Sequence, residues 1–71
     1  MMKDQLLKAL NMKYMGEIEA AKANIEIYLT NSVGIGEHPD IIGAIDSQMH
    51  QIAEAEDKIV VLRTHFIPPK I

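Results

Sequence analysis

The stretch "IIGAIDSQMHQIAEAEDKIVVLRTHF", residues 41–66, decides the fold of this 71-residue chain. Apolar side chains recur in it every seven residues, and a second set stands three or four residues from the first. These positions hold Ile45, Ile52, Ile59 and Phe66, and between them Ile41, Gln48, Ala55 and Leu62. Such a heptad is typical of a coiled-coil seam, and it predicts a long helix that packs one side against another helix.

Prolines mark the two ends of this helix. Pro39 suits the first helical position, and Asp40 after it favours the positive end of the helix dipole. Pro68 and Pro69 cannot continue a helix. We therefore expect a helix over about residues 39–66, followed by a proline-containing tail over residues 67–71.

An earlier helix is predicted over about residues 4–30. Its apolar residues recur at steps of three and four, which is the pattern of one helical face. They are Leu7, Leu10, Tyr14, Ile18, Ala21, Ile25 and Leu29. The pattern repeats after eleven positions, as from Leu7 to Ile18 to Leu29, and this period suits a nearly straight helix.

The segment between the two helices, "NSVGIGEH" at residues 31–38, has the glycine content of a phosphate-binding loop but not its context. No strand precedes it, and Pro39 stands where a third glycine would be needed. Glu37 and Asp40 would also repel a phosphate. We therefore expect a turn that folds the chain back on itself.

The whole chain, residues 1–71, is then predicted to form one all-α domain, an antiparallel two-helix hairpin. In such a hairpin, residues whose numbers sum to about 70 face each other. Ala21 is expected opposite Met49, and Tyr14 is expected near Glu56.

A hairpin of this size has little core of its own. The chain has no cysteine, so no disulfide can stabilise it, and only 4% of its residues are aromatic although 48% are hydrophobic. Short chains without such supports commonly gain stability by association.

The chain offers no membrane-spanning segment. No uncharged apolar run approaches the ~20 residues that a span needs, and charged and polar residues interrupt the N-terminal region where a signal peptide would be apolar. We expect no membrane partner and a cytoplasmic location.

Both helices carry more apolar surface than one partner helix can cover. The candidate interface residues form a second, small-residue face on the first helix and a flank of the seam on the second. They are Leu6, Ala9, Gly16, Ala20, Ala23, Ile27, Ile42, Met49, Val60 and Arg63. They predict a bundle of at least four helices, completed by homo-oligomerisation or by docking on another protein. The alternative is that the alanines only favour helix formation on a side that faces solvent.

Two charged residues interrupt the apolar arc of the second helix. Unpaired burial of Glu56 or Arg63 would be costly. Either they are paired, Glu56 with Tyr14 and Arg63 with Asp4 or with Glu56 of another subunit, or their charged ends reach solvent at the edge of the arc.

Metal or catalytic chemistry has little support in the sequence. Asp46, His50, Glu54 and Asp57 form one polar stripe whose ligand types could hold a metal ion. A single stripe rarely encloses an ion, and the first helix has no histidine to complete it. We therefore interpret the stripe as a solvated face and expect no catalytic residue, no metal, no cofactor and no small-molecule substrate.

Charge is distributed unevenly along the chain. Residues 1–13 have a net charge of +2, residues 14–57 of −8 and residues 58–71 of +3. A hairpin brings the two basic segments together at its open end, away from an acidic body. An alternative function is therefore a small regulator that binds nucleic acid or an acidic protein through this end. Without interleaved aromatic residues or a recognition motif, nucleic acid is the less favoured partner.

The runs "KANIEIYLTN" at residues 22–31 and "GIGEHPDIIGAIDSQMHQIAEAEDKI" at residues 34–59 resemble small uncharacterised helical proteins of T-even-like tailed phages of marine cyanobacteria. The resemblance implies a phage-encoded accessory protein, for example a capsid decoration or cement component of the virion, and it assigns no catalytic residue. The leading interpretation is a non-enzymatic structural or interaction protein that self-associates or clamps onto a larger assembly.

Overall fold

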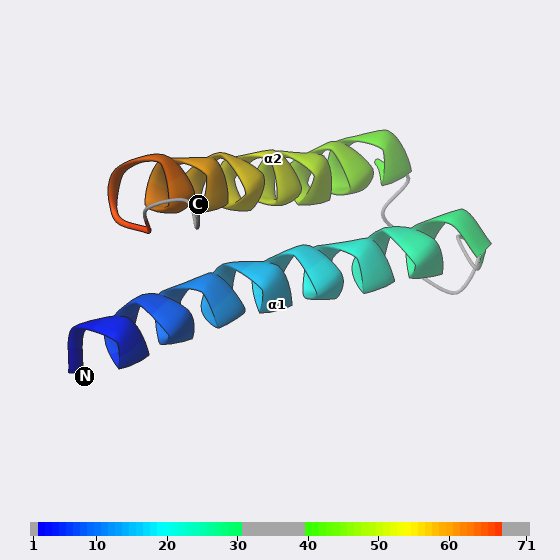
Figure 1. The fold of residues 1–71 in the computed structure, drawn as a ribbon. Helices are drawn as coiled ribbons and strands as arrows, with labels where there is room; N and C mark the ends of the chain where they lie inside the picture. Colours follow the sequence, from blue (N-terminus) through cyan, green and yellow to red (C-terminus); the bar gives the residue numbers. More distant parts are fainter. Residues whose placement is uncertain (1, 31–39, 68–71) are drawn as a thin grey trace.

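The protein is an antiparallel hairpin of two long helices. The computed structural model describes residues 2–30 and 40–67. Helix α1 spans Met2–Thr30 and helix α2 spans Ile41–His65, and they lie side by side in a rod of 50 × 18 × 17 Å. The start of α1 and the end of α2 lie at one end of the rod, the open end, and the end of α1 and the start of α2 lie at the other (Figure 1). No strand occurs in the described ranges, so the predicted all-α hairpin is confirmed.

The start of α2 differs from the expected one by two residues. The helix begins at Ile41, and Asp40 is its N-cap, with a carboxylate that accepts a hydrogen bond from the Gly43 backbone N–H at 2.9 Å. A Cβ atom added to Gly43 would lie only 2.7 Å from the Asp40 Cγ, so the glycine leaves room for this cap. Pro39, like the predicted turn at residues 31–38, lies outside the described residues.

The far end of α2 lies one residue before the predicted position. Phe66 is the C-cap, and its backbone N–H donates to the Leu62 carbonyl at 2.9 Å. The prolines at positions 68 and 69, to which the stop was attributed, lie outside the described residues.

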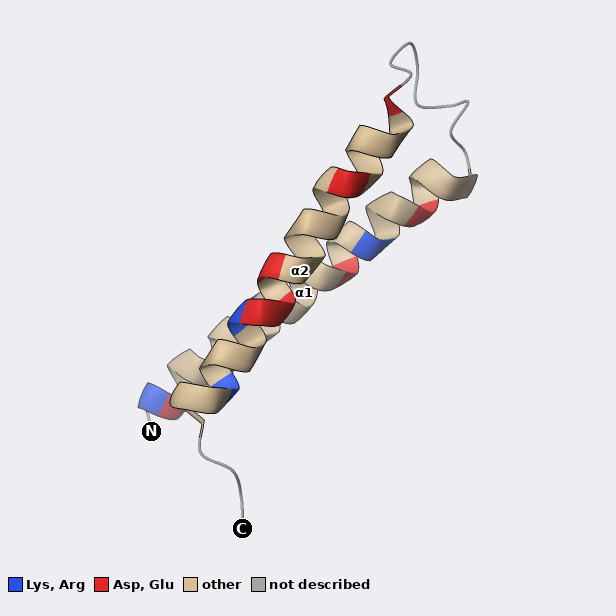
Figure 2. Ribbon diagram, turned by 90° about the horizontal axis from the view of Figure 1, so that it is seen from above, with Lys and Arg blue, Asp and Glu red and all other residues tan. Residues whose placement is uncertain are grey.

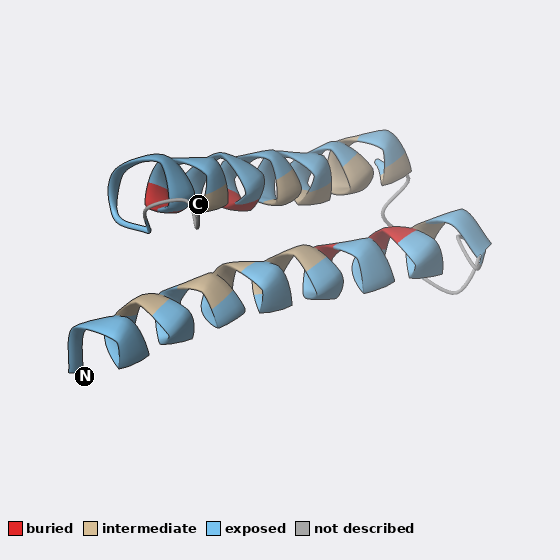
Figure 3. Cartoon of the chain, viewed as in Figure 1, coloured by how far each residue is buried: buried red, intermediate tan, exposed pale blue. Residues whose placement is uncertain are grey.

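The predicted seam of α2 is confirmed along the helix. Seven of its eight positions are buried or half-buried, and they face α1 (Figure 3). The exception is Phe66, which is 55% exposed because it stands beyond the last helical turn.

The predicted seam of α1 is wrong at two positions. Leu10 is 39% exposed and Leu29 is 70% exposed, whereas Asn11 and Tyr28 are half-buried. The observed seam is a heptad of Leu7, Asn11, Tyr14, Ile18, Ala21, Ile25 and Tyr28. The reason lies in α2, because a stripe that repeats every seven residues stays in contact only with another seven-residue stripe, while an eleven-residue stripe drifts away around the helix.

The register between the helices is shifted by two residues from the expected one. Asn24 Nδ2 donates to Gln48 Oε1 at 3.1 Å, and Lys58 Nζ lies 5.6 Å from the centre of the Tyr14 ring. Tyr14 therefore lies beside Lys58 rather than beside Glu56, two positions earlier in the chain.

The core is small. Among the described residues, the buried hydrophobic side chains are Ala21, Ile25, Ala55 and Leu62. Thirteen larger hydrophobic residues of the same ranges are exposed. The outward sides of both helices are exposed along their whole length (Figure 3).

Candidate interaction surface

All ten residues predicted to form an interface are exposed in the hairpin, but they do not form one surface. Six belong to α1 and, by helical spacing, lie on its side away from α2. These are Leu6, Ala9, Gly16, Ala20, Ala23 and Ile27. A Cβ atom added to Gly16 would meet nothing within 4 Å, so the small residue at this point serves no contact inside the hairpin.

The other four predicted residues lie on α2, and two of them line a groove between the helices. Val60 and Arg63 line this groove, which has a volume of about 500 Å3. Its remaining lining residues are Met15, Ile18, Glu19, Glu56 and Ile59. The floor is apolar, and the charged residues stand around it.

Met15 is the groove residue that the sequence interpretation missed. It directly follows Tyr14, so it flanks the seam of α1 and is 50% exposed. The heptad of α2 could have identified it, because a seven-residue seam on α2 requires one on α1 as well, and that seam places position 15 on its flank. The eleven-residue pattern predicted for α1 did not show this.

The groove side of α2 forms a continuous line that we call the outer stripe. Its members flank the seam at alternating steps of four and three residues, and all of them are exposed. They are Ile42, Asp46, Met49, Ala53, Glu56, Val60 and Arg63. It carries apolar residues interspersed with charged residues of both signs.

Glu56 and Arg63 reach solvent at the edge of the groove. Both residues are exposed, and no hydrogen bond or ion pair joins Glu56 to Tyr14 or Arg63 to Asp4 within the described part of the chain. Of the two alternatives, the single hairpin therefore shows the solvated arrangement.

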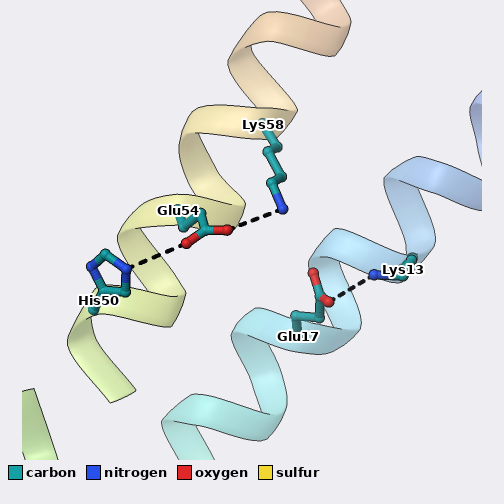
Figure 4. A network of polar contacts seen from close by, with 5 residues as sticks. All are labelled: Lys13, Glu17, His50, Glu54 and Lys58. Carbon is teal, nitrogen blue, oxygen red and sulfur yellow. Dashed lines mark hydrogen bonds and ion pairs between the residues drawn. The ribbon is translucent and has the colours of Figure 1, made fainter. Parts of the chain in front are cut away.

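The opposite side of the hairpin has an apolar groove near the open end, lined by Leu10, Val61 and Phe66 among others. The charged side chains farther along this side are paired within each helix. Lys13 Nζ lies 2.8 Å from Glu17 Oε2 on α1 (Figure 4). On α2 the Glu54 carboxylate lies between His50 Nε2 at 3.4 Å and Lys58 Nζ at 3.2 Å. This face has partners for its charges already, unlike the outer stripe.

The Lys13–Glu17 pair has a visible electrostatic effect. The hydrogen bond from Lys13 is the main cause that lowers the pKa of the Glu17 carboxyl from its ordinary value. The same hydrogen bond, with the charge of Glu17, raises the pKa of Lys13. Lys13 is exposed and Glu17 is half-buried at the edge of the seam, and the pair holds these side chains in place without forming a site.

The polar stripe of α2 is not assembled as a metal site. Glu54 is engaged by His50 and Lys58, and the described residues contain no group of three His, Cys, Asp or Glu side chains placed to hold a metal ion. In the same ranges, neither helix has both the length and the apolar character needed to cross a bilayer.

Charge is polarised along the rod. The open end carries Lys3, Lys8, Lys13, Lys58 and Arg63 against a single acid, Asp4. In the rest of the described residues, acids predominate and Lys22 is the one basic residue. Figure 2 shows the basic residues gathered towards the open end and most acids farther along the rod.

No protein-family model, no curated protein sequence and no solved structure matches this chain. Its function must therefore be argued from the surfaces described above.

Proposed function

We propose that this protein is a non-enzymatic structural or interaction protein, a helical hairpin that self-associates or clamps onto a larger assembly through its exposed apolar faces. The observation that carries the proposal is the imbalance between four buried hydrophobic residues and thirteen exposed larger ones in the described ranges. Where such residues adjoin one another, as beside the groove and on the outward face of α1, they favour contact with another macromolecule.

Packing energetics support the same proposal. Two helices pack along one seam, whereas a bundle of four encloses a core from several sides. The surfaces available for that purpose are the outward face of α1, around Ala20, and the groove side with the outer stripe of α2. Additional helices on these faces would bury side chains such as Ile27 and Met49, which are 53% and 52% exposed.

The resemblance of residues 22–31 and 34–59 to small proteins of tailed phages supports one kind of assembly. A short helical rod that binds through apolar side faces suits a decoration or cement role, in which a small component bridges larger subunits. In that role the protein would be found in the virion as well as in the host cytoplasm.

The proposal is tested by measuring the mass of the purified chain with light scattering across micromolar concentrations. We expect a mass above that of one 7.9 kDa chain. Ala20→Glu, which puts a charge on the outward face of α1, is expected to lower the mass if that face is used while leaving the helical signal in circular dichroism intact. Gln51→Glu is the matched control, because it adds the same charge on the polar face. A folded monomer at hundreds of micromolar, unchanged by either substitution, would contradict self-association.

A further inference from the structure

The residues of the outer stripe of α2 are complementary to the same residues read in the reverse order. When the stripe is laid against a reversed copy of itself, an acid lies opposite a base and a methionine opposite a valine. The matched positions are Asp46 with Arg63, Met49 with Val60, and Ala53 with Glu56. All three matches share one midpoint, between residues 54 and 55.

We propose that the outer stripe is the docking site of a second copy of this chain, placed antiparallel so that each α2 lies against the α2 of the other copy. The inference rests on the proposed function and names the partner, the face and the orientation. A two-fold axis crosses the rod at the shared midpoint and places the residues of each match opposite each other.

Helix α1 supports the same axis independently. Lys8 lies seven residues before Met15 and Glu26 lies seven residues after Glu19, so both belong to the side of α1 that lines the groove. In an antiparallel pair, Lys8 of one copy lies against Glu26 of the other, and the midpoint of this match is residue 17.

The two midpoints lie at the same level of the rod. Glu17 and Ala55 line a common groove between the helices, so the centre of the α1 match and the centre of the α2 match coincide. One two-fold axis therefore satisfies both helices at once.

Charge distinguishes this orientation from the parallel one. In a parallel pair stacked through the same side, α1 lies over the α2 of the other copy. Lys8 would then lie against Arg63, and Glu26 against Asp46, so that each of these two contacts would join residues of like charge. The antiparallel pair places opposite charges together at all of these positions, and each contact occurs twice.

Size and apolar content also suit a second copy. One lengthwise face of the rod measures 50 by 18 Å, which is close to the ~800 Å2 per partner that a standard interface buries. Met49 and Val60 are 52% and 59% exposed, and they meet on either side of the axis. Glu56 is the exception, because the two copies of this acid lie near the axis and repel each other.

The test is a charge exchange at the Asp46–Arg63 match, read out as the dissociation constant from sedimentation equilibrium. Arg63→Glu and Asp46→Lys each place like charges together at two contacts, and each is expected to weaken the dimer roughly tenfold. The double variant restores opposite charges and is expected to recover the wild-type constant. Matched controls are Lys3→Glu and Asp57→Lys, which make the same changes away from the outer stripe and should leave the constant unchanged.

Two further variants examine the axis itself. Glu56→Gln removes the repulsion at the centre and is expected to lower the dissociation constant by a few fold. Because the chain has no cysteine, Met12→Cys and Lys22→Cys chains can be mixed and oxidised. These positions also share residue 17 as their midpoint, so the mixed disulfide should form faster than either symmetric one.

The outcomes separate this inference from the proposed function. If the wild-type chain associates but the single reversals leave the constant unchanged, or the double variant is no tighter than the single ones, the antiparallel dimer is wrong and association through another face stands. A wild-type chain that is monomeric by sedimentation overturns the dimer directly. Circular dichroism of each variant shows whether the hairpin itself is folded.

Discussion

Asn11 is the residue at which the seam of α1 departs from an apolar pattern. It occupies a heptad position between Leu7 and Tyr14, and its Oδ1 atom is buried without a hydrogen-bond partner among the described residues. Its Nδ2 reaches only the Met15 sulfur at 3.5 Å, and thioether sulfur is a weak acceptor. A buried polar atom without a partner lowers stability.

Asn11→Leu is expected to raise the free energy of unfolding by about 1–2 kcal/mol, because it removes an unsatisfied polar group and adds apolar contact in the seam. Chemical denaturation at fixed protein concentration measures the change. Asn24→Leu is the matched control, since Asn24 is exposed and hydrogen-bonded to Gln48, and it should bring no gain. If both variants lose stability equally, the unsatisfied oxygen is not a weakness of the fold.

The Lys13–Glu17 pair predicts a definite pH dependence. The pKa of Glu17 is lowered in the folded chain, so its contribution to stability is present above the ordinary carboxyl value and is lost as the pH falls through the lowered pKa. The pKa of Lys13 is raised, so its contribution is present below the ordinary amine value and is lost as the pH rises through the raised pKa. An NMR titration of Glu17 should show its pKa rise in Lys13→Ala. The same titration in Lys22→Ala, whose lysine pairs with Glu19 instead, should match the wild type.

At the scale of the helices, the seam of α2 could be predicted from sequence and that of α1 could not. The heptad of α2 has apolar residues at nearly every position and one consistent period. In α1 the exposed Leu10 and Leu29 offer an apolar alternative to Asn11 and Tyr28, and a single helix contains nothing that chooses between them. The period of the partner helix makes the choice.

Two leucines test this assignment of the seams. Leu62→Ala should cost about 2–4 kcal/mol, because Leu62 is 5% exposed and its truncation leaves a cavity. Leu29→Ala should change the free energy of unfolding by less than ~0.5 kcal/mol, since Leu29 is 70% exposed. Thermal unfolding followed by circular dichroism gives both values. If the two variants lose equal stability, Leu29 belongs to the seam and the eleven-residue pattern predicted for α1 is correct after all.

The candidate surface was predicted only in part, for a geometric reason. A helical-wheel projection of one helix shows which residues lie outside its seam, and all ten predicted residues are exposed. The projection does not show which side of α1 lies next to which side of α2. That relation places Val60 and Arg63 with Met15, and it leaves Ala20 on a separate surface.

At the scale of the whole molecule, the rod has a small core. Its described residues bury four hydrophobic side chains and leave thirteen larger ones exposed. The proposed self-association would make the stability of the fold depend on protein concentration by mass action.

The melting temperature is expected to rise with the concentration of the chain. A partner present at 100 times its dissociation constant adds ~2.7 kcal/mol to the stability of the folded state. Melting curves recorded at concentrations from a few to several hundred micromolar measure the effect. A midpoint that stays constant over this range would show that the single hairpin carries its own stability.

The unequal spacing of the two inter-helix contacts sets an order of folding events. The Asn24–Gln48 hydrogen bond closes a segment of 24 residues. The contact of Lys58 with Tyr14 closes one nearly twice as long, at an entropic cost greater by ~0.6 kcal/mol. The helices should therefore zip from the acidic end towards the basic one. In the reverse direction, we expect the basic end to fray before the acidic end of the helices, so that within residues 2–30 and 40–67 a protease should cut near the basic end first.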